Sequence, residues 1–201
     1  DMHYWDVWHG KKSFDAYYAI KPRFVSEFGY QSFPSYSTVK TYAAEKDMNL
    51  TSPVMEFHQR SPSGNTIMIE NFARYFRFPK SIKDMLYLSQ VQQSVAMRTA
   101  IDYWRSLRPY CMGSIIWQLN DNCPVASWSS IEYTGKWKLM HYDAVKFFAP
   151  VGLSLYIKDN ILYACGLNDT QQNIASELTL SYIGFDGKKI DKDIVLKKEL
   201  K

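Results

Sequence analysis

The longest regular pattern in the sequence is an apolar repeat between Ser81 and Leu107. Its apolar residues recur near the 3.6-residue period of an α-helix, and Pro109 follows the last of them. They are Ile82, Met85, Leu88, Val91, Val95, Ile101, Trp104 and Leu107. A helix this long with an apolar stripe has to cover an apolar surface made by other segments. The repeat therefore requires a folded domain around it.

Two short apolar segments, one on each side of this helix, predict buried strands. Residues 23–27 (RFVSE) and 111–119 (CMGSIIWQL) are short and rich in β-branched and aromatic residues. Further helices are expected at 35–45, with Ser35 or Ser37 as the N-cap, and at 135–149. The order strand, helices, strand, helix is typical of a parallel α/β unit.

The pattern changes after Pro150. Four segments alternate apolar and polar residues, and Asp159-Asn160 and Asp186-Gly187 supply hairpin turns between them. They are 153–157, 161–167, 176–185 and 188–198. They predict the start of an antiparallel sandwich, with fewer strands than the roughly seven of an immunoglobulin-like module. We expect two domains, residues 1–149 and 150–201.

The charge pattern argues against a nucleic-acid partner. The net charge of +4 comes from 24 basic and 20 acidic residues that are mixed along the chain. Nucleic-acid binders gather Lys and Arg on one face. The one Lys-dense stretch, 187–201, alternates with acids, which is typical of a solvated strand face. No apolar run reaches the roughly 18 residues of a membrane helix, and no signal peptide is visible, so we expect no membrane partner.

Cysteine and histidine spacing predicts no metal site. The three cysteines, Cys111, Cys123 and Cys165, form no CxxC pair, and the four histidines show no HxxxH or HExxH spacing. Ser26 and Gly29 do not form a GxSxG frame, which argues against a serine hydrolase. We expect neither metal nor cofactor. The high aromatic content, 15 Tyr, 11 Phe and 6 Trp, fits either core packing or stacking on sugars.

Two residues near the ends of the predicted strands are candidates for chemistry. Alternation within 23–27 makes Glu27 the last inward residue, and Trp117 lies near the end of 111–119. In barrels of parallel strands, reactive groups lie at the carboxyl ends. A carboxylate beside an indole suits a sugar site. Spacing alone nevertheless favours a salt bridge for Glu27 and core packing for Trp117, because buried aromatics usually have no catalytic role.

Three stretches of the chain resemble one enzyme family. PRFVSEFGYQSFPS is similar to the nucleophile segment of the β-mannosidases of glycoside hydrolase family 2. GSIIWQLNDNCPVASWSSIEYTGKWKLMHYDAVKFFAP resembles the segment with their last barrel strand and helix, and DMHYWDVWHG resembles the stretch before the nucleophile strand. Together they lie between residues 1 and 150 in the expected order.

The resemblance implies a fold and a set of site residues. It makes 23–27 and 111–119 the seventh and eighth strands of a (β/α)8 TIM barrel, followed by a partial immunoglobulin-like antiparallel β-sandwich. It makes Glu27 the nucleophile and Trp117 a wall of the subsite for the cleaved sugar. The aromatic opening would lie near the pocket and contact substrate, through Tyr4, Trp5 and Trp8.

The implied activity is hydrolysis of terminal β-D-mannose residues by a retaining double displacement. This mechanism needs two carboxyl groups about 5–5.5 Å apart. In the family the acid/base is the Glu of an Asn-Glu pair on the fourth strand, but this chain contains no Asn-Glu, and Glu70-Asn71 has the reverse order. Glu45, Glu56 and Glu132 lie on expected helices or loops. We expect a carboxyl-terminal piece of a larger enzyme that is inactive alone and self-associates through its open barrel edge.

Two alternatives remain open at this point. The chain resembles, more distantly, other family 2 exo-glycosidases that act on galactosides, glucuronides or glucosaminides, although SEFGYQSFPS and WQLND favour the mannosidase branch. A noncatalytic carbohydrate-binding or interaction module would use the same aromatic residues. The family resemblance favours a periplasmic, extracellular or lysosomal location over a cytoplasmic one.

Overall fold

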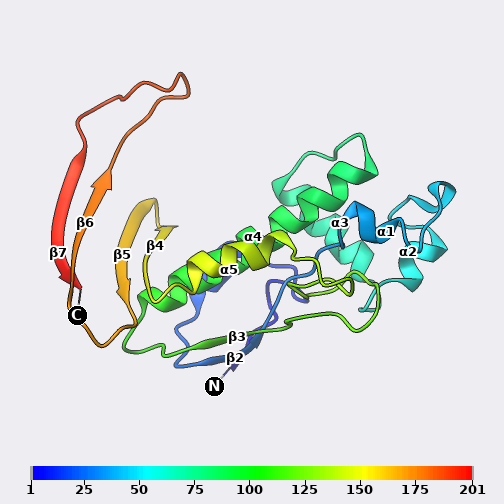
Figure 1. Cartoon of the computed structure of the whole chain (residues 1–201), viewed down its shortest axis with the longest axis horizontal. Coiled ribbons are helices and arrows are strands. Elements are labelled where there is room, and N and C mark those ends of the chain that lie inside the picture. Colours follow the sequence, from blue (N-terminus) through cyan, green and yellow to red (C-terminus); the bar gives the residue numbers. More distant parts are fainter. Residues whose placement is uncertain (1, 201) are drawn as a thin grey trace.

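The structure, a computed structural model, describes residues 2–200, and a small parallel sheet lies along its lower edge in Figure 1. Its strands are β1 (Met2–His3), β2 (Val25–Phe28) and β3 (Ser114–Ile116), with β2 in the middle and both pairs parallel. The parallel pairing of the two predicted strands is confirmed. β1 is an additional strand, and its two residues are too short to produce a sequence pattern.

The helices lie between and after these strands. They are the 3-10 helices η1 (Phe14–Ala19) and η2 (Glu45–Asp47), and the α-helices α1 (Tyr36–Val39), α2 (Pro53–Phe57), α3 (Gly64–Tyr75), α4 (Ile82–Ser106) and α5 (Leu139–Phe147). In Figure 1, α1 to α3 gather at one end of α4, and α5 lies beside α4. Phe28 of β2 packs edge-on against Trp104 of α4, with ring centroids 4.7 Å apart, so α4 covers the sheet.

The longest predicted helix is confirmed as α4. The Ser81 side chain caps it by accepting a hydrogen bond of 3.1 Å from the backbone N–H of Asp84. The helix expected at 35–45 is wrong in length, because α1 has only one turn. Thr41 donates its backbone N–H and its hydroxyl to the carbonyl oxygen of Thr38, which a continuing α-helix would use for Tyr42.

α3 was not predicted. Ser63-Gly64 has the composition of a turn, and Ser63 does adopt a left-handed conformation with φ of 60°. The helix begins immediately afterwards at Gly64, so the turn residues mark its start and not a loop.

The last third of the chain forms two antiparallel hairpins. β4 (Val151–Lys158) pairs with β5 (Ile161–Asn168), and β6 (Ile174–Leu180) pairs with β7 (Ile194–Leu200). Asp159 and Asn160 form the tight turn predicted for them, both with positive φ. The hairpins are separate two-stranded sheets, at the opposite end of α4 from α1 to α3 (Figure 1). All four strands are predicted by the sequence. They do not form a complete sandwich.

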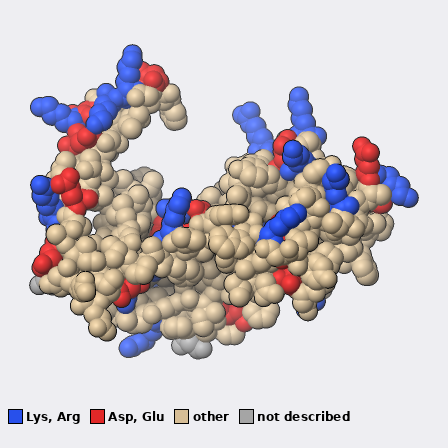
Figure 2. Space-filling view, viewed as in Figure 1, with Lys and Arg blue, Asp and Glu red and all other residues tan. Residues whose placement is uncertain are grey.

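Aromatic residues supply much of the core. Tyr17, Phe28 and Trp104 are almost fully buried, and Tyr17 of η1 and Phe28 of β2 both pack edge-on against Trp104 of α4. This use accounts for much of the high aromatic content. Basic and acidic side chains are interspersed on the face that Figure 2 shows. Within residues 2–200, no helix has the length and apolarity to cross a membrane, and no group of His, Cys, Asp and Glu is arranged to hold a metal ion.

Candidate active site

Glu27 lies near the carboxyl end of the central strand, β2. Its backbone carbonyl accepts a hydrogen bond of 2.8 Å from the N–H of Tyr4, which continues the pairing with β1. Its side chain is 27% exposed. Trp5 Nε1 donates a 2.8 Å hydrogen bond to Glu27 Oε1, and His3 Nδ1 lies 3.7 Å from the same oxygen. The strand pairing therefore brings an indole donor and an imidazole to a carboxylate that solvent can reach.

Trp117 lies on the neighbouring strand end. It follows β3 directly, and its backbone N–H donates a 2.8 Å hydrogen bond to the carbonyl of Phe28, the residue after Glu27. A cis peptide bond joins it to Gln118. Its side chain is one of the exposed large aromatics of the molecule, at 45%. An exposed indole face thus lies at the strand end adjacent to the one that carries Glu27.

Gly29 is required by the close approach of these segments. A Cβ atom at this position would lie 2.2 Å from the backbone oxygen of Trp117, 3.1 Å from Trp128 Cδ1 and 3.2 Å from Trp5 Cη2. Contacts below 3 Å to backbone atoms have no room to relax. The lack of a side chain at position 29 lets the turn after Glu27 pack against all three tryptophans.

Trp128 belongs to this cluster, and the sequence reasoning missed it. Its ring packs edge-on against Trp5, with centroids 5.9 Å apart, and His9 lies 5.1 Å from Trp5 and 6.1 Å from Trp128. Burial lowers the pKa of His9. Trp128 lies in an irregular loop with no periodic pattern. The only sequence signal is the aromatic itself, inside a stretch that resembles the family.

The structure uses Tyr4 and Trp8, two of the expected substrate contacts, as core residues. Trp8 has 0% exposure and packs edge-on against Tyr30 and Trp128. Tyr4 is 9% exposed, and its hydroxyl donates to the carbonyl of Ala16 at 2.9 Å. Their rings offer almost no surface to a sugar, because the segment folds back onto η1. Of the expected contacts, Trp5 donates to Glu27, and Trp117 follows the adjacent strand end, where its backbone binds Phe28.

Several other carboxylates are engaged elsewhere. Glu132 is buried and accepts hydrogen bonds from Ser35 and Thr38, and Glu70 pairs with Lys11 on the surface. Asp121 is buried and accepts from the hydroxyls of two serines, Ser127 and Ser129. None of these interactions involves Glu27, so they identify no partner carboxyl group for it among the described residues.

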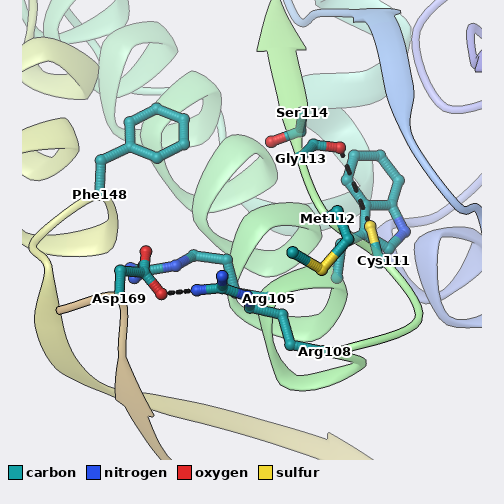
Figure 3. Close-up of a pocket in the computed structure, with 9 residues that line it drawn as sticks. Arg105, Arg108, Cys111, Met112, Gly113, Ser114, Phe148 and Asp169 are labelled. Carbon is teal, nitrogen blue, oxygen red and sulfur yellow. Dashed lines mark hydrogen bonds and ion pairs between the residues drawn. The ribbon is translucent and has the colours of Figure 1, made fainter. Parts of the chain in front are cut away.

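A pocket of about 230 Å³ lies at the other end of β3 (Figure 3). It is lined by the residues that lead into this strand and by Arg105, Arg108 and Asp169. Asp169 accepts a 2.9 Å hydrogen bond from Arg105 and also pairs with Arg108. The pocket therefore lies where α4 meets the end of β5, away from the carboxyl ends of the strands, and we assign it no catalytic role.

No family model matches the chain. It is 35% identical to a β-mannosidase of Capra hircus over 193 residues, which are 90% of this chain and 22% of the relative. It is 41% identical to a β-mannosidase of Bos taurus over 144 residues, 65% of this chain and 16% of the relative. The chain thus spans about a fifth of the length of the curated relatives it matches.

Solved structures give the same relationship. A β-D-mannosidase from Dictyoglomus thermophilum superposes with a TM-score of 0.85 and 33% identity over 100% of this chain and 26% of that one. An exo-chitosanase from Amycolatopsis orientalis superposes with a TM-score of 0.71 over 94% of this chain and 24% of that one, at 16% identity, which shows a shared fold alone. By sequence and by fold, the chain therefore belongs to the β-mannosidase family of glycoside hydrolases.

Proposed function

We propose that this chain carries the nucleophile of a retaining β-mannosidase, and that Glu27 is that nucleophile. The observation that carries the proposal is the geometry at the end of β2. A partly exposed carboxylate is held by an indole N–H, beside the exposed ring of Trp117 on the adjacent strand end. Sugars bind by stacking an apolar face on an aromatic ring while polar groups fix the reacting atoms.

The contacts of Glu27 suit nucleophilic attack. Trp5 Nε1 and His3 Nδ1 both approach Oε1. No hydrogen bond to Oε2 is formed by the described residues, so this oxygen is the one available to attack the anomeric carbon. Attack forms a glycosyl ester and breaks the bond to the leaving oxygen, which a second carboxyl group protonates; that group later deprotonates the water that hydrolyses the ester. We place this acid/base outside residues 1–201.

The parallel sheet supports a barrel assignment. We propose that β2 and β3 are the seventh and eighth strands of a (β/α)8 barrel and that β1 is the end of the sixth. Their parallel pairing and the position of Glu27 at a carboxyl end support this assignment. We propose further that the hairpins after Pro150 begin an immunoglobulin-like sandwich.

We infer that the chain by itself is inactive and self-associates. The outer edges of β1 and β3 carry no strand partner among residues 2–200, and the nearby side chains of Met112, Ile115 and Leu119 are more than half exposed. Unpaired strand edges and apolar patches recruit partners. Sedimentation of the 201-residue chain should give a mass that rises with concentration, and a stable monomer that cleaves an aryl β-mannoside would contradict both statements.

The nucleophile is tested by covalent labelling. The intact enzyme that contains this chain is treated with a 2-deoxy-2-fluoro-β-mannoside carrying a good leaving group, digested, and analysed by mass spectrometry. We expect the sugar mass on the peptide that contains Glu27, and Glu27→Gln should lose both label and turnover. Glu70→Gln is the matched control, because Glu70 pairs with Lys11 on the surface. Label on a different peptide would refute the assignment, and a panel of aryl glycosides would show whether mannose is the preferred sugar.

A further inference from the structure

We propose that Gln93 and Lys138 are positioning residues for the Glu27–Trp5 pair. They hold the segment after Glu27 against the loop that carries Trp128. The two residues come from different helices, and neither touches Glu27. This inference rests on the proposed function, because it concerns the geometry of the same nucleophile.

Gln93 lies on α4 and is completely buried. Its Nε2 donates to the carbonyl of Tyr30, in the segment after Glu27, at 2.8 Å. The same nitrogen lies 3.2 Å from the carbonyl oxygens of Trp128 and Ser129 in the other segment. Its Oε1 accepts a 2.7 Å hydrogen bond from the hydroxyl of Ser32. A single amide therefore links both segments to α4.

Lys138 links the same two segments from the start of α5. It is the N-cap residue of α5, with 0% exposure, and its Nζ donates to the carbonyls of Ser32 at 3.3 Å and Ser127 at 3.4 Å. The charged or polar groups that face it are the carboxylates of Asp121 and Glu132, which attract its positive charge. Among residues 2–200 no ion pair joins Lys138 to either carboxylate, so the two backbone carbonyls are the hydrogen-bond acceptors for its buried ammonium group.

The side chains of Gln93 and Lys138 donate to backbone carbonyls that the N–H groups of a neighbouring strand would bind in a sheet. In the described part of the chain, the backbones of the two segments pair directly only at the bridge between Ser32 and Ser127, with N to O distances of 3.0 and 3.3 Å. Beyond that bridge, the carbonyl of Trp128 accepts a 3.3 Å hydrogen bond from the N–H of Gln118, but the carbonyls of Tyr30 and Ser129 have no donor other than Gln93 among residues 2–200. A buried carbonyl without a donor destabilises the fold, because it loses its hydrogen bond to water and gains none in return. Gln93 supplies the donor that a neighbouring strand would otherwise supply.

Gln93 and Lys138 are connected to Glu27 through two aromatic rings. Trp128 packs against Trp5 at 5.9 Å, and Trp5 donates to Glu27. Gly29 lies between these rings and the backbone of Trp117 with no room for a side chain. A shift of the Trp128 loop would therefore move Trp5, and with it the donor on the nucleophile.

The chain offers a matched control for a purely structural effect. Gln92 is the neighbouring residue of α4, is 3% exposed, and donates a 2.9 Å hydrogen bond to a backbone carbonyl as Gln93 does. That carbonyl belongs to Asn71 of α3; the Gln92 side chain approaches the hydroxyl of Tyr30 but holds no backbone carbonyl of either segment at the site. Gln92→Met and Gln93→Met both replace a buried amide by an apolar side chain of similar shape. If both variants lose stability but only Gln93→Met alters the site, the effect on Glu27 is not a general consequence of losing a buried amide.

The test uses a spectroscopic signature of the Trp5 indole. The intact enzyme that contains this chain is labelled with 5-fluorotryptophan, and the fluorine resonance that is lost in Trp5→Phe is assigned to Trp5. We expect Gln93→Met and Lys138→Met to shift that resonance and Gln92→Met to leave it in place. An unchanged Trp5 resonance in folded Gln93→Met, or equal shifts in Gln92→Met, would overturn the proposal.

The same variants are then compared in the intact enzyme by the rate of covalent labelling with the fluorinated mannoside. Gln93→Met should label about tenfold to a hundredfold more slowly, because small displacements of reacting groups have effects of this size. If Gln93→Met does not fold, Ser32→Ala removes only the hydroxyl that binds Gln93 Oε1 and should shift the resonance less, in the same direction; no shift would overturn the proposal. Failure of the proposed function is seen separately, as wild-type enzyme without label at Glu27.

Discussion

Trp5 Nε1 donates a 2.8 Å hydrogen bond to Oε1 of Glu27, although the two residues are 22 positions apart in the chain. The relationship follows from the parallel pairing of β1 with β2, which brings the residue after Tyr4 level with the carboxyl end of β2. An ionised acceptor makes this bond stronger than one between neutral groups. The first prediction concerns this bond.

Trp5→Phe should slow the formation of the glycosyl ester while leaving the fold nearly unchanged. Phenylalanine keeps most of the packing against Trp128 but has no N–H for Glu27. A hydrogen bond to a charged group contributes about 1.5–3 kcal/mol, which corresponds to a loss of about ten- to a hundredfold in kcat/KM of the intact enzyme. The measurement is steady-state kinetics on an aryl β-mannoside.

Trp8→Phe is the control for this substitution. Trp8 is more deeply buried than Trp5, but its Nε1 has no hydrogen-bond partner among residues 2–200. Trp8→Phe should lower the free energy of unfolding without a comparable loss of kcat/KM. Equal losses of kcat/KM in the two variants would show that packing of the aromatic cluster matters, and not the bond to Glu27.

The sequence predicts those parts of the fold that depend on local pattern. α4 has a capping serine, a sustained apolar period and a proline after its end, and it begins and ends within a residue or two of the expected bounds. Asp159-Asn160 likewise specifies its own turn. β1 was missed because two residues hold no pattern, and its strand character comes from pairing with β2.

The residues of the candidate site likewise fall into those that the sequence predicts and those that it does not. Glu27 and Trp117 follow from strand alternation together with the family resemblance. Trp128, Gln93 and Lys138 do not, because their roles depend on contacts between segments far apart in the chain. The apolar period of α4 even hides Gln93, since the helix buries polar side chains on the face toward the loops. Buried polar residues of this kind are identified by their partners and not by their spacing.

Gly29→Ala should destabilise the chain by about 1–3 kcal/mol, the range of overpacked cores. The added methyl group would overlap the backbone oxygen of Trp117, which cannot rotate away as a side chain could. Gly152→Ala provides the comparison, because the nearest atom to a Cβ there is 4.0 Å away. Urea unfolding followed by circular dichroism measures both. A Gly29→Ala variant as stable as Gly152→Ala would mean that the turn after Glu27 adjusts freely.

Asp169→Ala should loosen the first hairpin from α4. Asp169 follows β5 and binds both Arg105 and Arg108 (Figure 3), and Arg105 also donates to the carbonyls of Phe147 and Ala149. The Arg105 side chain is only 11% exposed, so its bond to Asp169 is less screened than a surface pair. We expect a loss of about 1–2 kcal/mol and faster amide exchange in β4 and β5.

Glu177→Ala is the control for Asp169→Ala. Glu177 pairs with Lys197 across β6 and β7 at 3.4 Å, and both side chains are more than half exposed. Exposed pairs contribute about 0–1 kcal/mol. Exchange in β4 and β5 should be unaffected by this change. Similar exchange in the two variants would contradict the anchoring role of Asp169.

Lys138 predicts a pH dependence of stability with a defined sign. Burial lowers its pKa from 10.5 to about 8, against the attraction of Asp121 and Glu132. Below pH 8 the folded and unfolded chains both hold the proton, and the folded chain bears the full cost of a buried charge. Between pH 8 and 10.5 only the unfolded chain holds it, so this residue makes the free energy of unfolding rise with pH across that window.

The rise is measured as a difference between two proteins. Urea unfolding of wild type and Lys138→Met at intervals from pH 7 to 10.5 removes the contribution of every other titrating group. Relative to the variant, wild type should gain on the order of 3 kcal/mol between pH 8 and 10.5, from about 1.36 kcal/mol for each unit of lowered pKa. Parallel curves, or a relative loss with rising pH, would mean that Lys138 keeps an ordinary pKa in the folded chain and that its charge is not isolated from water.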